Sequence, residues 1–135
     1  MPVEPDAQQL TEIAGLAGAD GDGPVVMLNL NLYRDREEYL RYGEVALAVL
    51  ERVGGHILWQ ADCRQTVIGD DSDRYDEVIA VWYPSLAAFS ELATDPQILE
   101  ARSHRLEGLE RAALICCAPG VFADQAGVLS SELQR

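Results

Sequence analysis

Hydrophobic and polar residues alternate along residues 25–33, the most regular pattern in the chain. One side of the alternation carries Val26, Leu28, Leu30 and Leu32, and the other carries Met27, Asn29, Asn31 and Tyr33. Because successive side chains of a β-strand point to opposite faces of a sheet, this pattern predicts a half-buried strand. The leucine side is expected to meet the helices of the fold.

A helix is predicted directly after this strand, since Asp35 and Glu38 have the spacing of an N-terminal capping box. Gly54-Gly55 is expected to end the helix, because glycine tolerates the left-handed conformation common at helix ends. The predicted apolar stripe consists of Tyr39, Leu40, Leu47, Leu50 and Val53.

The rest of the chain predicts three more strands and a divided helical segment. Strands are expected over residues 56–68, 77–83 and 112–117, with Pro84 ending the second of these. Ser85 and the pair Asp95-Pro96 each have the character of a helix start, so two short helices are expected between the last two strands.

The order strand, helix, strand, strand, helix, strand predicts an α+β fold, a ferredoxin-like β-α-β-β-α-β sandwich. Its four-stranded antiparallel sheet carries both helical segments on one face. Residues 24–118 are expected to form this domain, residues 1–23 a lead-in with a short helix over residues 6–16, and residues 119–135 a C-terminal arm. The other face of the sheet needs a cover, and a second copy of the chain is the expected one.

Size and charge narrow the class of protein. The chain has 135 residues, 48% of them apolar, which suffices for one hydrophobic core. Its 10 basic and 23 acidic residues give a net charge of −13, which argues against nucleic acid or an anionic membrane as a partner. The N-terminus lacks signal-peptide character and no apolar stretch is long enough to span a bilayer, so we expect a cytoplasmic protein.

No motif for a metal or cofactor is found. Cys63, Cys116, Cys117 and the two histidines lack the spacing of a metal site, and the acidic run at residues 70–73 lacks the spacing of a calcium loop. That run is expected to be a solvated turn. Phosphate-binding glycine motifs and a nucleophile with an adjacent base are also missing. We therefore expect neither a metal nor a cofactor.

Several short stretches together resemble one protein family. They are Val26-Met27-Leu28-Asn29-Leu30, Tyr42-Gly43, Tyr75-Asp76-Glu77-Val78, Tyr83-Pro84-Ser85, Thr94-Asp95-Pro96 and His104-Arg105-Leu106-Glu107-Gly108-Leu109-Glu110. In order and spacing they resemble the domain of unknown function 1330 family, small bacterial proteins of the dimeric α/β-barrel, ferredoxin-like superfamily. The resemblance covers residues 24–118. Trp82 departs from it, since a smaller residue is expected there, and the shape of the cavity is expected to differ accordingly.

The resemblance implies a homodimer whose two sheets face each other. It also implies kinship with a superfamily that contains cofactor-free monooxygenases, isomerases, dechlorinating and cyclising enzymes, and haem-degrading proteins. Because one fold supports so many reactions, the resemblance does not select one of them.

Three residues are candidates for catalysis. His104 suits proton transfer, since the reference pKa of imidazole is about 6.5. Arg105 suits an anionic group of a substrate, and Asn29 suits a carbonyl that needs a hydrogen-bond donor. On a helical wheel His104 lies away from the apolar face and beside Arg102 and Arg105, which places it at a cleft mouth or on the surface. For Asn29, bonding to neighbouring protein groups is the alternative.

Four aromatic residues and one arginine are the candidates for a substrate pocket. They are Tyr33, Tyr42, Trp59, Trp82 and Arg102. Aromatic side chains on strands can sandwich a flat apolar ligand, and core packing is the alternative role.

These residues support a cofactor-independent enzyme, of monooxygenase, isomerase or lyase type, that acts on a small and partly apolar organic acid. Two alternatives remain open: a non-catalytic module that binds a small molecule, and a purely structural dimer.

Overall fold

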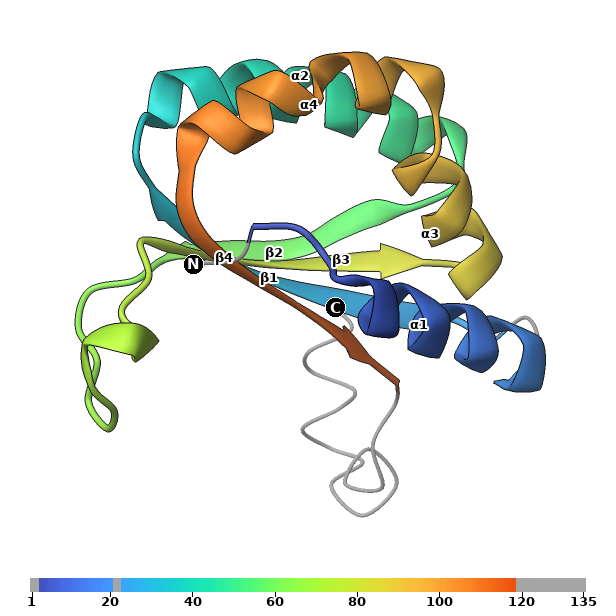
Figure 1. Cartoon of the computed structure of the whole chain (residues 1–135), viewed down its shortest axis with the longest axis horizontal. Helices are drawn as coiled ribbons and strands as arrows, with labels where there is room; N and C mark the ends of the chain where they lie inside the picture. Colours follow the sequence, from blue (N-terminus) through green and yellow to red (C-terminus); the bar gives the residue numbers. More distant parts are fainter. Residues whose placement is uncertain (1–2, 21–22, 119–135) are drawn as a thin grey trace.

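The structure, a computed structural model, describes residues 3–20 and 23–118. Its helices are α1 (Ala7–Asp20), α2 (Arg36–Arg52), α3 (Leu86–Ala93) and α4 (Pro96–Gly108), and its strands are β1 (Val25–Tyr33), β2 (His56–Asp62), β3 (Glu77–Tyr83) and β4 (Leu109–Cys117). Helices α2 and α4 lie side by side over one face of the sheet (Figure 1). The order of elements from β1 onward is the predicted one, and the α+β, ferredoxin-like fold class is confirmed.

The strands form one antiparallel sheet in the order β2-β3-β1-β4. Strand β3 has the predicted bounds, and β4 begins at Leu109 rather than at Ala112. The prediction for β2 is wrong at its end, because the strand stops at Asp62 instead of Ile68. The N–H of Cys63 still donates to the carbonyl of Asp76, and the chain then leaves the sheet as a long loop that contains a 3-10 turn.

The two sides of β1 are reversed relative to the prediction. Met27 packs in the core under the helices, and the Asn31 amide bonds the hydroxyl of Tyr39 on α2, so the asparagine and tyrosine side meets the helices. Leu28 and Leu30 point to the other side of the sheet, which we call the open face. The reason is that alternation shows that two faces differ and does not show which of them the helices cover.

Helix α2 begins as predicted, with the Asp35 carboxylate accepting from the N–H of Glu38 at 3.2 Å. The predicted stripe is wrong at Leu40 and Leu47, which are 51% and 52% exposed. Leu50 is buried as predicted, and Val49, which was not in the stripe, is buried with it. Apolar residues occupy so much of the circumference of this helix that their pattern does not locate the centre of the buried side.

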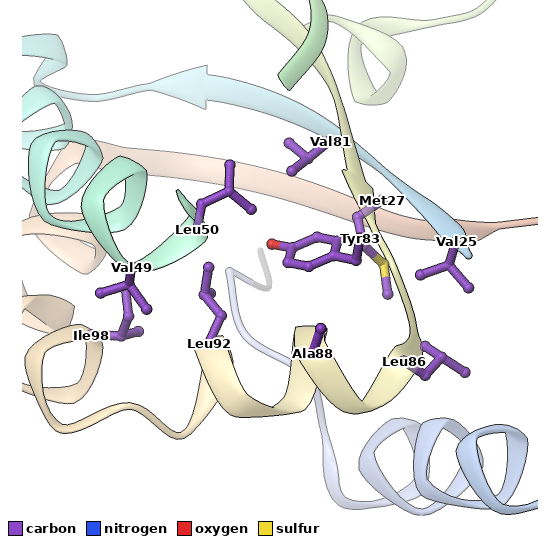
Figure 2. Close-up of a cluster of buried hydrophobic side chains, with 10 residues drawn as sticks. All are labelled: Val25, Met27, Val49, Leu50, Val81, Tyr83, Leu86, Ala88, Leu92 and Ile98. Carbon is purple, nitrogen blue, oxygen red and sulfur yellow. The ribbon is translucent and has the colours of Figure 1, made fainter. Parts of the chain in front are cut away.

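The hydrophobic core lies at one end of the space between the sheet and the helices. Figure 2 shows its buried side chains, which are Val25, Met27, Val49, Leu50, Val81, Tyr83, Leu86, Ala88, Leu92 and Ile98. The strand residues among them come from the first half of β1 and the paired second half of β3. The other halves of these strands carry polar side chains on the same face.

The shorter helices follow their predicted starts. Ser85 Oγ accepts from the N–H of Ala88 at 3.0 Å to begin α3, and an Asp95 carboxylate oxygen accepts from the N–H of Gln97 at 2.8 Å to begin α4. The expected helix over residues 6–16 is present as α1. The predicted C-terminal arm, residues 119–135, lies outside the described residues. Among the helices of residues 3–20 and 23–118, none has the length and apolar run needed to cross a bilayer.

Candidate functional site

A buried carboxylate lies on the helix side of the sheet, beyond the end of the core. Glu77 is 6% exposed and stands opposite Asn31 in the register. Its Oε1 accepts from Asn31 Nδ2 at 3.3 Å and from the Tyr33 hydroxyl, and its Oε2 accepts from Gln60 Nε2 at 2.8 Å. These three donors are neutral, and no salt bridge to Glu77 occurs within the described part of the chain. Hydrogen bonds alone therefore offset the cost of burying this acidic group.

Tyrosine rings surround this carboxylate. The ring centroids of Tyr33 and Tyr39 are 5.2 Å apart, and those of Tyr39 and Tyr42 are 5.7 Å apart. Burial raises the pKa of Tyr39 to about 12. Burial, and next the hydrogen bond to Glu77, raise the pKa of Tyr33. The hydroxyls of Tyr33 and Tyr39 thus keep their protons at neutral pH, so they can donate hydrogen bonds but cannot act as bases there.

We call Glu77 and its neighbours Asn31, Tyr33, Tyr39 and Gln60 the cluster. It is open to solvent at the edges of the sheet. Gln60 lies on the edge strand β2 and is exposed, although its amide reaches Glu77. On the opposite edge, Leu114 of β4 is 46% exposed and pairs with Asn29. A ligand that displaces the Gln60 amide would reach Glu77 Oε2 directly.

Two cations lie near the tyrosines, Arg36 over the ring of Tyr33 and Arg105 beside Tyr42. Burial raises the pKa of Tyr42, and the positive charge of Arg105 on α4 partly opposes that rise. The Arg105 guanidinium donates to the carbonyl of Val3, which fixes it against the N-terminal segment. An anionic group bound beside the tyrosines would be attracted by this charge.

The structure brings four of the predicted site residues together on the helix side of the sheet: Asn29, Tyr33, Tyr42 and Arg105. Asn29 Nδ2 donates to the carbonyl of Met27 at 3.2 Å. Its amide has a second N–H, for which the described residues supply no hydrogen-bond acceptor.

Two predicted residues of α4 make contacts away from Glu77. His104 Nδ1 lies 3.3 Å from Glu38 Oε2, and its side chain is 39% exposed. Arg102 forms an ion pair with Glu4, with Nη2 to Oε2 at 2.6 Å. His104 thus links α4 to α2, and Arg102 links α4 to the N-terminal segment.

The two tryptophans lie on the open face, across the sheet from Glu77. Trp82 pairs with Val26 and stacks on His56, with ring centroids 4.9 Å apart. Trp59 pairs with Ala80 after a register shift in β2, and it is 51% exposed. The sheet therefore separates the predicted pocket residues into two groups.

Metal binding has no support in the described residues, where no group of three or more His, Cys, Asp or Glu side chains is placed to hold an ion. The acidic run at residues 70–73 closes a turn instead. The Asp70 carboxylate accepts from the N–H of Ser72 at 2.9 Å, and the Asp73 carboxylate accepts from the N–H of Asp70 at 3.0 Å.

Sequence reasoning missed three members of the cluster, namely Glu77, Tyr39 and Gln60. Tyr39 was assigned to core packing. A signal for Glu77 exists, since it is an acidic residue at the start of an apolar strand. The register that sets Glu77 opposite Asn31 and beside Gln60 was needed to recognise it.

Comparison with known proteins places the chain in one family and in a widespread fold. A family model described as "Domain of unknown function (DUF1330)" matches residues 26–118. A crystal structure of a protein of unknown function from Rhodopseudomonas palustris is 33% identical with a TM-score of 0.79, and the alignment covers 87% of this chain and 96% of that one. No curated protein matches the chain.

More distant solved structures share the fold alone. A dabb family protein with a ferredoxin-like fold from Mesorhizobium loti is 16% identical with a TM-score of 0.55, over 73% of this chain and 98% of that one. A hydroxynitrile lyase from Passiflora edulis is 12% identical with a TM-score of 0.56, over 75% and 97% of the two chains.

Proposed function

This chain belongs to the DUF1330 family, a domain of unknown function, and from that premise we propose that it is a homodimeric, cofactor-independent enzyme that moves a proton on a small organic acid. The observation that carries the proposal is Glu77, a buried acidic side chain bonded only to neutral donors. The Glu77 carboxylate is enclosed by neutral side chains and forms no ion pair with a described residue. That property suits a general base.

The substrate is a keto acid with an apolar body. In the proposed step the Glu77 carboxylate takes a proton from the carbon next to the carbonyl, and the electron pair of that C–H bond forms an enolate. Asn29 donates its free N–H to the developing oxyanion, since it lies diagonally from Glu77 at a spacing of about 7–8 Å that a small substrate spans. The proton then returns to the same carbon, or to the oxygen to give the enol, so no oxidant or cofactor is consumed.

The remaining predicted residues take positioning roles. Arg105 attracts the carboxylate of the substrate, and the rings of Tyr33 and Tyr42 contact its apolar body. The proton-transfer role passes from His104 to Glu77, because Glu77 is the more enclosed group and lies among the other candidates. The fold shared with a hydroxynitrile lyase agrees with an enzyme of lyase type.

The homodimer is proposed to form through the open face of the sheet. Leu28 and Leu30 lie there with both tryptophans, across the sheet from Glu77. A second copy would cover them and leave the cluster around Glu77 open at its own edge. Each copy then carries one complete site.

Deuterium exchange tests the proposed step. A panel of α- and β-keto acids, phenylpyruvate among them, is followed by proton NMR in D2O with the wild type, Glu77→Gln and His104→Ala. Glu91→Gln, which changes an exposed carboxylate on α3, is the control. We expect the wild type and Glu91→Gln to speed exchange above buffer and Glu77→Gln to lose at least about 100-fold of that rate.

Other outcomes change the assignment. If His104→Ala loses the activity and Glu77→Gln keeps it, the proton-transfer role belongs to His104. If a keto acid binds with no faster exchange, the protein is a binding module instead of an enzyme. If no keto acid binds or exchanges, the proposed substrate class is wrong.

A further inference from the structure

The segment before α1, residues 3–6, is bound to α4, and we call it the strap. Arg105 of α4 donates to the carbonyl of Val3. Arg102 holds the Glu4 carboxylate with two hydrogen bonds, of which the one from Nη2 to Oε2 is 2.6 Å long. Figure 1 shows the strap (dark blue) between the level of α4 and that of the strands, on its way to α1.

Two arginines act on the one carboxylate of Glu4. Arg102 and Arg105 are three residues apart on α4, a spacing that places side chains on the same side of a helix. The hydrogen bond from Arg102 lowers the pKa of Glu4, and the positive charges of both arginines add to this effect, although burial opposes it. Glu4 is therefore ionised at neutral pH. The pair of arginines forms a site that accepts a carboxylate, and the chain's own Glu4 fills it.

The strap competes with the proposed substrate for Arg105. The charge of Arg105 acts on Tyr39 of the cluster and on the neighbouring Tyr42, so this guanidinium lies at the rim of the proposed site. One of its N–H groups is bound to the carbonyl of Val3. That N–H becomes available to a substrate carboxylate only when the strap moves away.

Little holds the strap in place. The side chains of Arg102 and Glu4 are 54% and 36% exposed, and ion pairs this open to solvent contribute little to stability. Among residues 7–16 of α1 only Ile13 is not fully exposed, and it packs against the core. A helix of 14 residues is marginally stable in water by itself. The strap and α1 can therefore leave α4 at small cost.

We propose that the strap is a removable cover of the site, in which Glu4 takes the place of the substrate's carboxylate on Arg102 and Arg105. An organic acid displaces Glu4, binds the two arginines in its place and releases the strap together with α1. The inference rests on the proposed function, in which Arg105 attracts the carboxylate of the substrate. It adds the regulation of that site, because the chain competes with its own substrate.

Competition of this kind also selects the acid that binds. A tethered group competes at an effective concentration of roughly millimolar order. An acid that offers only a carboxylate, such as acetate, gains no more from the arginines than Glu4 does. An acid with an apolar body gains contact with the tyrosine rings as well, so it displaces Glu4 at a lower concentration.

Binding of benzoate to the full chain tests the strap, because benzoate has a carboxylate and an apolar ring but no C–H beside a ketone. Isothermal titration calorimetry compares the wild type with Glu4→Gln, which removes the charge of the strap and keeps its size. Glu12→Gln makes the same change on the exposed side of α1 and is the control. Hydrogen exchange of residues 7–20, with and without benzoate, reports the release of α1, and far-UV circular dichroism verifies that both variants are folded.

Glu4→Gln is expected to bind benzoate at least about threefold more tightly than the wild type and Glu12→Gln do. Residues 7–20 are expected to exchange faster in the wild type saturated with benzoate, and in Glu4→Gln without it, because a helix of this length unfolds once it is undocked.

Equal affinities of all three proteins would overturn the strap and leave the proposed function standing. Bound benzoate that does not change the exchange of α1 would have the same meaning. If none of the three proteins binds benzoate, the pair of arginines is not a carboxylate site and the inference is wrong. Deuterium exchange of the keto acids through Glu77 then decides the proposed function separately.

Discussion

Replacing Tyr33 by phenylalanine is the sharpest test of the cluster around Glu77. The change removes the hydroxyl that donates to Glu77 Oε1 and keeps the ring, which contacts Tyr39 and lies 5.5 Å beneath the Arg36 guanidinium carbon. A hydrogen bond to a charged group contributes about 1.5–3 kcal/mol, and a buried acceptor left unpaired adds a cost of its own. We expect Tyr33→Phe to lower the free energy of unfolding by about 1.5–3 kcal/mol.

Two further tyrosine-to-phenylalanine variants provide the comparison for the loss of stability in Tyr33→Phe. Tyr39→Phe removes the hydroxyl that accepts a 3.3 Å hydrogen bond from Asn31 Nδ2. Both groups are neutral, so the free energy of unfolding should fall by about 0.5–1.5 kcal/mol. Tyr42→Phe removes a hydroxyl that has no hydrogen-bond partner in the described residues, and a change within about 0.5 kcal/mol is expected. The expected order of destabilisation is Tyr33, then Tyr39, then Tyr42.

Urea unfolding followed by far-UV circular dichroism gives these free energies. All variants are compared at one protein concentration, because dimerisation would make the midpoint depend on concentration. A double-mutant cycle with Glu77→Gln should show a coupling of at least about 1 kcal/mol between Tyr33 and Glu77. If Tyr33→Phe costs no more than Tyr42→Phe, or if that coupling is zero, the hydrogen bond does not hold the carboxylate.

Two further predictions concern the surroundings of the cluster. A Cβ at Gly108 would lie 2.6 Å from the backbone nitrogen of Tyr39, so Gly108→Ala should lower the free energy of unfolding by about 1–3 kcal/mol. Gly43→Ala, whose Cβ would have no atom within 4 Å, should raise that free energy by about 0.5–1 kcal/mol. Equal melting temperatures for both variants would contradict this packing. Burial raises the pKa of Tyr39 from its ordinary value of 10.0 to about 12, so the folded state holds that proton more tightly. The resulting stabilisation of the folded state is complete below pH 10 and is lost as the pH rises toward 12. The absorbance of tyrosinate reports the ionisation, and alkaline unfolding reports the loss of stability. Ionisation of every tyrosine together near pH 10 would refute this prediction.

Local sequence signals predicted the fold well, because they depend on neighbouring residues only. The caps at Asp35, Ser85 and Asp95 each bond the backbone as expected. Alternation located β1, and the chain order of strands and helices set the class of fold. The end of β2 was missed, since the apolar residues Val67 and Ile68 lie in the exposed loop that follows the strand.

The site was only half predictable, because it depends on which elements face each other. Alternation correctly placed Asn29 and Tyr33 on the same side of β1. That side was predicted to face away from the helices, and in the structure it faces them. The two tryptophans were grouped with Asn29 and Tyr33, although they lie on the other face of the sheet. The sequence does not show the register shift in β2 that precedes Trp59. Glu77 became a candidate only once pairing brought the side chains of three strands together.

Proton abstraction by Glu77 is tested most directly by the rate at which phenylpyruvate incorporates deuterium at the carbon beside its carbonyl. The wild type is expected to exceed the rate of buffer alone, and Glu77→Gln is expected to lose at least about 100-fold of the excess while it remains folded. Equal rates for buffer, wild type and Glu77→Gln would contradict a proton-transfer role for this carboxylate.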